Sequence, residues 1–154
     1  MLDKKLDKIT NILNEYLQKF DCVAKSDSNF AYISSTNEIH YALILADRYE
    51  KTFMAFVNKL FPYIKADPFL WSLYHEIGHH ETENDFEEWE EEEYRTKASS
   101  NITDEEYYNL PIEYAATAWA GEYMETHQNE INNLWDKLQP AIKDFFKQMN
   151  IEEE

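Results

Sequence analysis

The spacing of apolar residues changes along the chain, and this change constrains the fold more than any other feature. Over most of the chain, apolar residues recur at steps of three and four, which is the spacing of one helix face. This spacing predicts helices over residues 2–20, 48–61, 67–80, 111–127 and 129–149. The region from Asp21 to Leu45 differs, because β-branched and aromatic residues cluster there on both sides of a polar turn.

The strand-like region predicts a small antiparallel sheet. Residues 29–34 and 38–45 are the predicted strand pair, and Cys22 to Lys25 is a candidate third strand. Combined with the helical segments, this predicts an α+β fold in which the sheet packs on a mainly helical domain. The length of 154 residues fits a single domain over 1–154. Pro140 predicts a kink or break in the last helix.

The charge of the chain is strongly negative and unevenly distributed. There are 31 acidic residues against 14 basic ones, a formal charge of −17, which disfavours nucleic-acid binding by a basic surface. Residues 81–109 have no clean period and hold a dense acidic run, which we interpret as an insertion. Its simplest interpretation is a solvated or disordered stretch, and in either interpretation its irregular period and charge density predict that it is dispensable for folding. The alternative is a docking element for a basic partner, since Phe86, Trp89 and Tyr94 alternate with the acids.

The sequence shows no feature of a membrane or secreted protein. The longest apolar stretch, Tyr41 to Ala46, is far shorter than the roughly 20 residues of a membrane span. The first residues show no pattern of a secretory signal. Cys22 is the single cysteine, so no internal disulfide and no cysteine-based metal site can form. We therefore expect a cytoplasmic protein.

The residues His75-Glu76-Ile77-Gly78-His79 form an H-E-x-x-H sequence within a predicted helix. Histidines four positions apart lie on the same helix face, where two imidazoles can bind one Zn²⁺. Glu76 projects from the neighbouring flank and can act as a general base toward a water molecule. Gly78 is costly inside a helix, and its presence suggests a close approach of another backbone. The alternative is two ordinary surface histidines.

A catalytic zinc site needs a third protein ligand and an open position. The candidates are Glu113, His127, His40, His80 and the carboxylates of the acidic insertion. Glu113 is the best of them, because it begins a helix whose following alanines would let two helices approach closely. Its alternative role is a solvated glutamate favoured by the helix dipole.

Two segments resemble the ImmA/IrrE family of bacterial and phage zinc metallopeptidases. Residues 73–80 match its HELGH motif, and the helix from Pro111 matches its E-x-x-A-N-x-F-A motif, with Trp119 in place of Phe and Thr117 in place of Asn. The resemblance implies a minimal zincin-like metallopeptidase with His75, His79 and Glu113 as ligands and Glu76 as base. It also implies an altered contact to the metal ligands from Thr117. The insertion between the motifs is unusually long.

The leading functional hypothesis is therefore a zinc-dependent endopeptidase with one zinc ion per chain. Its substrate would be a protein or peptide, and the resemblance implies a regulatory protein such as a phage or mobile-element repressor. Candidate oxyanion donors are Tyr114, Tyr123 and His127. The alternative is an acidic interaction protein, either a DNA mimic or a binder of a basic partner, with a structural or vestigial zinc site.

Overall fold

The computed structural model describes residues 1–153, with side chains as far as Asn150. The elements are α1 (Leu2–Leu17), η1 (Gln18–Phe20), β1 (Val23–Ser26), β2 (Ala31–Ile33), β3 (Glu38–Tyr41), α2 (Asp47–Leu60), α3 (Pro68–Thr82), η2 (Glu83–Asp85), α4 (Glu88–Ala98), α5 (Asp104–Tyr108), α6 (Pro111–Thr126) and α7 (Gln128–Glu153). The molecule is mostly helical with one small sheet, as an α+β fold requires. The chain forms two compact units, one of residues 1–43 and 127–154, the other of residues 44–126.

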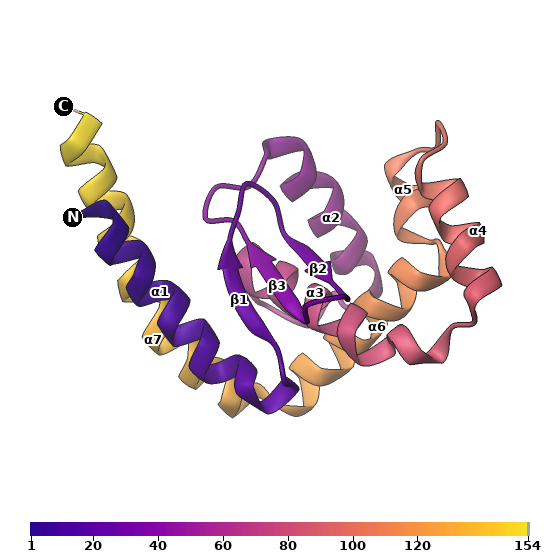
Figure 1. The fold of residues 1–154 in the computed structure, drawn as a ribbon, viewed down its shortest axis with the longest axis horizontal. Coiled ribbons are helices and arrows are strands. Elements are labelled where there is room, and N and C mark those ends of the chain that lie inside the picture. The colour runs from indigo at the N-terminus through magenta and orange to yellow at the C-terminus, as the bar shows by residue number, and fades with distance from the viewer. Residues whose placement is uncertain (154) are drawn as a thin grey trace. The chain divides into compact units, whose positions relative to one another are not determined.

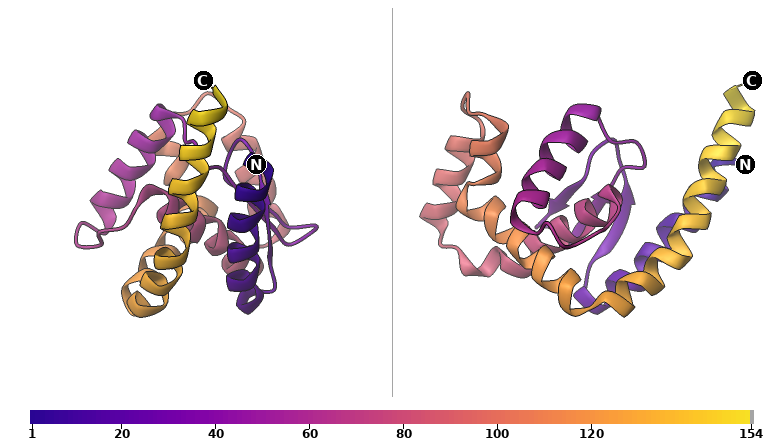
Figure 2. Two further views of the ribbon diagram at one scale, coloured as in Figure 1. Left: turned by 90° about the vertical axis from the view of Figure 1, so that its left-hand side faces the viewer. Right: turned by 180° about the vertical axis from the view of Figure 1, so that it is seen from behind.

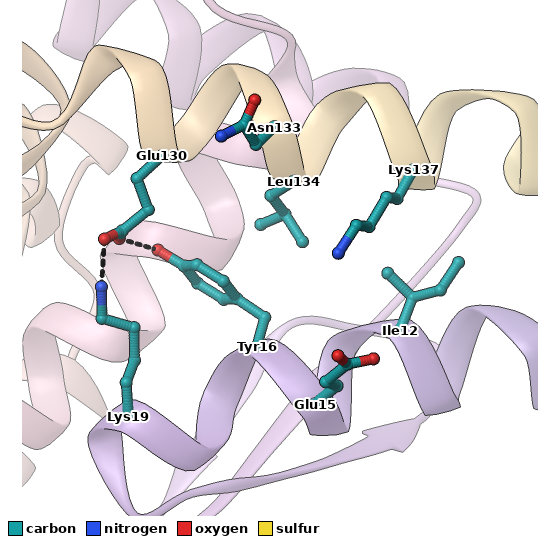
Figure 3. Close-up of a pocket in the computed structure, with 8 residues that line it drawn as sticks. All are labelled: Ile12, Glu15, Tyr16, Lys19, Glu130, Asn133, Leu134 and Lys137. Carbon is teal, nitrogen blue, oxygen red and sulfur yellow. Dashed lines mark hydrogen bonds and ion pairs between the residues drawn. The ribbon is translucent and has the colours of Figure 1, made fainter.

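In the first unit, α1 and α7 lie side by side and run in opposite directions (Figures 1 and 2). The apolar face of α1 is buried at Ile9, Leu13 and Leu17. Between the two helices lies a groove of about 520 Å³, shown in Figure 3. At one end of it, the Tyr16 hydroxyl donates a hydrogen bond of 2.6 Å to Glu130, which also pairs with Lys19.

The helix α7 continues through Pro140, so the predicted break does not occur. Proline removes one backbone hydrogen bond from a helix. Here Leu138 and Ala141, on either side of it, are buried. The packing of this apolar face keeps the segment helical despite the lost bond.

The sheet is mixed, which corrects the prediction of an antiparallel one. The strand order is β1-β3-β2, with β2 antiparallel to β3 and β1 parallel to β3. The β2–β3 hairpin leaves the other edge of β3 open, and β1 adds there in the direction in which it leaves α1. The side chain of Asn14 on α1 accepts a hydrogen bond of 2.6 Å from the backbone N–H of Ala24 and fixes β1 in place. The strand β3 ends at Tyr41 rather than at Leu45.

The second unit is organised around α3 and α6, which pack closely against each other. The helix α3 starts as predicted, because the Asp67 carboxylate accepts a hydrogen bond of 2.8 Å from the N–H of Phe69. Every residue of α3 from Phe69 to Gly78 is buried. At the contact, a Cβ added to Gly78 would lie 3.0 Å from the Cα of Ala116 and closer still to its carbonyl oxygen. Gly78 therefore allows the close backbone approach that its position suggested.

The acidic segment is helical rather than irregular. The glutamates in the first turn of α4 favour the helix through its dipole, and both α4 and α5 begin with a capping box. The spacing of apolar residues does not predict α4, because its consecutive glutamates give no apolar period. Tyr108 at the end of α5 is 6% exposed, with its ring centroid 5.4 Å from those of both Phe53 and Phe56. The segment thus contributes to the core and is not simply a solvated stretch.

Among the described residues, no helix combines the length and the apolar character that crossing a membrane requires.

Candidate metal centre

The helix α3 places His75 and His79 next to each other on one face. Their ring centroids are 4.7 Å apart, and one ligand atom from each of His75, Glu76 and His79 lies within 4.8 Å of the others. His75 is 3% exposed, and its ring packs edge-on against Phe53 at 5.2 Å. The two imidazoles are therefore held in a mostly dry environment.

Glu113, in the first turn of α6, extends its carboxylate to both imidazoles. Its Oε1 lies 3.0 Å from Nε2 of His75, and its Oε2 lies 3.2 Å from Nε2 of His79. The carboxylate is 3% exposed. The close packing of α3 on α6 brings these three side chains together from positions more than thirty residues apart.

Thr117, one turn after Glu113, contacts Nδ1 of His75 through its hydroxyl. The Thr117 hydroxyl donates to the backbone carbonyl of Glu113 at 3.2 Å. In this orientation it can also accept from an Nδ1–H of His75, 3.0 Å away, and that tautomer leaves the lone pair of Nε2 available to a metal.

The contact between His75 and Glu113 can hold either a proton or a cation. Nε2 of His75 lies 3.0 Å from Oε1 of Glu113, a distance at which an Nε2–H donates to the carboxylate. With the ring proton on Nδ1, the same two atoms both offer lone pairs to a cation. The arrangement is therefore suited to binding a metal ion.

Glu76 is the fourth member of the cluster. It is 7% exposed, and within the described part of the chain its Oε2 has no hydrogen-bond partner. Burial raises the pKa of Glu76 above its usual value, and the charges of His75 and His79 partly oppose this. A buried carboxylate with an unused oxygen is equipped to accept a proton from a water molecule beside it.

The electrostatics of the cluster favour a cation at its centre. Burial acts to lower the pKa of His79, but the charge and hydrogen bond of Glu113, with the charge of Glu76, outweigh it and raise the value to about 9. Burial acts in the opposite sense on Glu113, yet the charge of His79 and hydrogen bonds from both histidines bring its pKa well below the usual range. Two carboxylates with two neutral imidazoles would balance the charge of one divalent ion.

The donor atoms also fit the size of zinc. Ligands at about 2.0–2.1 Å from a tetrahedral Zn²⁺ are separated from one another by roughly 3.3 Å. Oε1 of Glu113 lies 3.0 Å from Nε2 of His75 and 3.3 Å from Nε2 of His79. Two imidazoles and a carboxylate are a common ligand set for catalytic zinc.

Two site residues lie in the acidic segment and were missed by the sequence reasoning. The Tyr94 hydroxyl, from α4, donates a hydrogen bond of 2.5 Å to Oε2 of Glu113, and the hydroxyls of Tyr94 and Tyr107 are 3.2 Å apart. Burial and the charge of Glu113 raise the pKa of both phenols, so both remain protonated at neutral pH. Tyr94 alternates with glutamates in the sequence, but nothing in that pattern indicates a contact with Glu113.

The other candidates are not brought to the cluster. Tyr114 is 42% exposed and packs edge-on against Phe56. Tyr123, about 15 Å along α6 from Glu113 by the helix rise, stacks on Tyr74 and Trp119. His127 follows the far end of α6. 

His40, a further candidate ligand, lies on the sheet of the first unit. Its ring binds Asp27 at 2.8 Å and Glu38 at 3.0 Å. These contacts occupy both ring nitrogens. His80, the neighbour of His79, is partly exposed near the end of α3.

Comparison of the chain with protein-family models, with curated proteins and with solved structures gives no match.

Proposed function

We propose that the protein is a zinc-dependent peptidase whose metal ligands are His75, His79 and Glu113. The observation that carries this proposal is the convergence of two imidazole nitrogens, from His75 and His79, on the buried carboxylate of Glu113. Beside them, Glu76 has a buried oxygen with no partner among the described residues. A catalytic zinc site with three protein ligands needs such a proton acceptor beside it.

The residues of the chain have distinct tasks in the proposed reaction. When bound, Zn²⁺ would lower the pKa of a water ligand and polarise the scissile carbonyl. Glu76 accepts the proton of the attacking water and returns it to the leaving amine. Thr117 holds His75 in the tautomer that presents Nε2. Phe53, packed on His75, keeps one side of the imidazole dry.

The proposed substrate is a protein, and the resemblance to the ImmA/IrrE family supports a regulatory protein such as a repressor. The resemblance rests on the H-E-x-x-H residues and on the helix containing Glu113 and Thr117, which are the same residues that meet in the cluster. A basic DNA-binding protein would also complement the charge of −17.

The test uses Glu76→Gln, which keeps the shape of the side chain and removes its ability to accept a proton. Zinc content, measured by elemental analysis, should remain near one ion per chain. Cleavage of unstructured proteins and of DNA-binding regulators encoded nearby should fall by about 10²–10⁴-fold. Glu81→Gln, the same charge change at an exposed position of α3, is the matched control and should cleave at the parental rate.

Three results would contradict the proposal in different ways. Equal cleavage by Glu76→Gln and the parent would mean that Glu76 is not the base. Zinc binding without any cleavage, together with equal binding of a basic partner by both proteins, would favour the acidic interaction protein. Full zinc retention in Glu113→Ala would place the third ligand elsewhere.

A further inference from the structure

The two oxygens of Glu113 have different surroundings. Oε1 faces the imidazoles, at 3.0 Å from Nε2 of His75 and 3.3 Å from Nε2 of His79. Oε2 lies 3.2 Å from the same nitrogen of His79, but its shortest contact is the 2.5 Å hydrogen bond from Tyr94. One oxygen is therefore directed at the candidate metal position and the other is held by a phenol.

The direction of the hydrogen bonds follows from the groups involved. The carboxylate of Glu113 can only accept, so Tyr94 donates its single proton to it. Tyr94 then has no proton left for Tyr107, and Tyr107 must donate to Tyr94 across their 3.2 Å contact. The result is a directed chain from Tyr107 on α5 through Tyr94 on α4 to Glu113 on α6. Hydrogen bonds in such a chain polarise and strengthen one another.

Tyr94 lies close to the start of α6. It lines a hollow of about 110 Å³ together with Leu110, Pro111 and Ile112, the residues immediately before Glu113. This place brings its hydroxyl within hydrogen-bond reach of the carboxylate. The phenol is neutral, so it orients Glu113 without cancelling the negative charge that attracts a cation.

From this geometry we propose that Tyr94 is a positioning residue that restrains Oε2, so that Glu113 binds the metal through Oε1 alone, with Tyr107 supporting Tyr94. The inference rests on the proposed metal site and adds a role for the acidic segment, which supplies both phenols. A carboxylate bound through one oxygen leaves a coordination position open, as a catalytic zinc site needs.

The experiment measures zinc affinity of the purified full-length chain by competition with a chromophoric chelator. Tyr94→Phe, which deletes only the hydroxyl, should bind zinc about 10–100-fold more weakly than the parent. Tyr107→Phe should give a smaller loss, because Tyr94 still contacts Glu113. Tyr63→Phe is the matched control, since its hydroxyl also donates to a glutamate, Glu125, but on an exposed surface. It should bind zinc like the parent.

A second readout separates positioning from a general loss of structure. With Co²⁺ in place of Zn²⁺, visible absorption weakens as the coordination number rises. Tyr94→Phe should show weaker bands than the parent, because the released Oε2 can also bind the ion.

Each remaining outcome decides against the inference. If the parent binds no zinc, the proposed function and this inference fail together. If the parent binds zinc and Tyr94→Phe matches it in affinity and in the Co²⁺ spectrum, this inference alone fails. Should Tyr94→Phe not fold, Tyr107→Phe provides the test, and parental behaviour of that variant would refute the proposed chain of hydrogen bonds.

Discussion

Gly78→Ala is the substitution that most directly tests how the two metal-binding helices are held together. By helix propensity alone, alanine should stabilise α3 by about 0.5–1 kcal/mol. The structure predicts the opposite. The added methyl would lie 3.0 Å from the Cα of Ala116 on α6, where carbon atoms prefer about 3.5–4.0 Å, and closer still to the carbonyl oxygen.

The loss of stability depends on what the added methyl group would meet, which is the backbone of α6. Overpacking typically costs about 1–3 kcal/mol, and the upper part of this range applies because a helix backbone cannot rotate out of the way. After the gain in propensity, Gly78→Ala should lower the free energy of unfolding by about 2 kcal/mol. For a chain of this length, that corresponds to a fall of about 4–8 °C in Tm.

The same change should disturb the metal site. Relief of the clash requires α3 and α6 to separate by roughly 0.5–1 Å, which would move His75 and His79 away from Glu113. Metal sites tolerate deviations of only about 0.2 Å in ligand distance. Zinc affinity should therefore fall by more than about tenfold.

The assay combines thermal unfolding with zinc competition, and the other glycine of the chain supplies the control. A Cβ on Gly121 would meet the ring of Phe61, a side chain that can turn aside. Gly121→Ala should therefore lose less stability and keep its zinc affinity. A Gly78→Ala protein that is as stable as the parent and binds zinc equally well would refute the argument that backbone contact sets the position of these helices.

The remaining predictions concern single side chains at the metal site and on the sheet. Thr117→Val keeps the shape of the side chain but removes the acceptor for Nδ1 of His75. Zinc affinity should therefore fall by about 10–100-fold. Unchanged affinity would mean that Thr117 does not set the tautomer of His75. The hydrogen bond with Glu38 raises the pKa of His40 against the effect of burial, and Asp27 adds to it, while the pKa values of both carboxylates are lowered. A histidine whose pKa is raised by folding stabilises the folded state. This contribution is fully present below the unfolded pKa of about 6.5 and is lost as the pH rises through the folded pKa. Urea unfolding should therefore show that His40→Asn is destabilised relative to the parent at pH 6 and much less so at pH 9, and an equal difference at both would contradict this assignment.

The local features of the candidate site can be predicted from short stretches of sequence. The i to i+4 spacing of His75 and His79 places both on one face of any helix that contains them. Asp67 followed by proline sets the start of that helix through a cap made two residues away. Gly78 inside a helix predicts a close contact with another backbone, although the sequence does not show which one. Each of these features depends on neighbours within one or two turns, so local sequence is sufficient to predict it.

The meeting of groups from distant segments depends on how the helices pack, which short stretches of sequence do not predict. Among several candidate carboxylates and histidines, the packing of α3 on α6 brings Glu113 to the imidazoles and gives Thr117 its contact with His75. The contact of Tyr94 with Glu113 depends on how α4 folds back onto the start of α6. The parallel pairing of β1 with β3 was missed for the same reason. The spacing of apolar residues specifies which face of a helix or strand is buried. Which other helix or strand covers that face depends on how all the elements of the unit pack together.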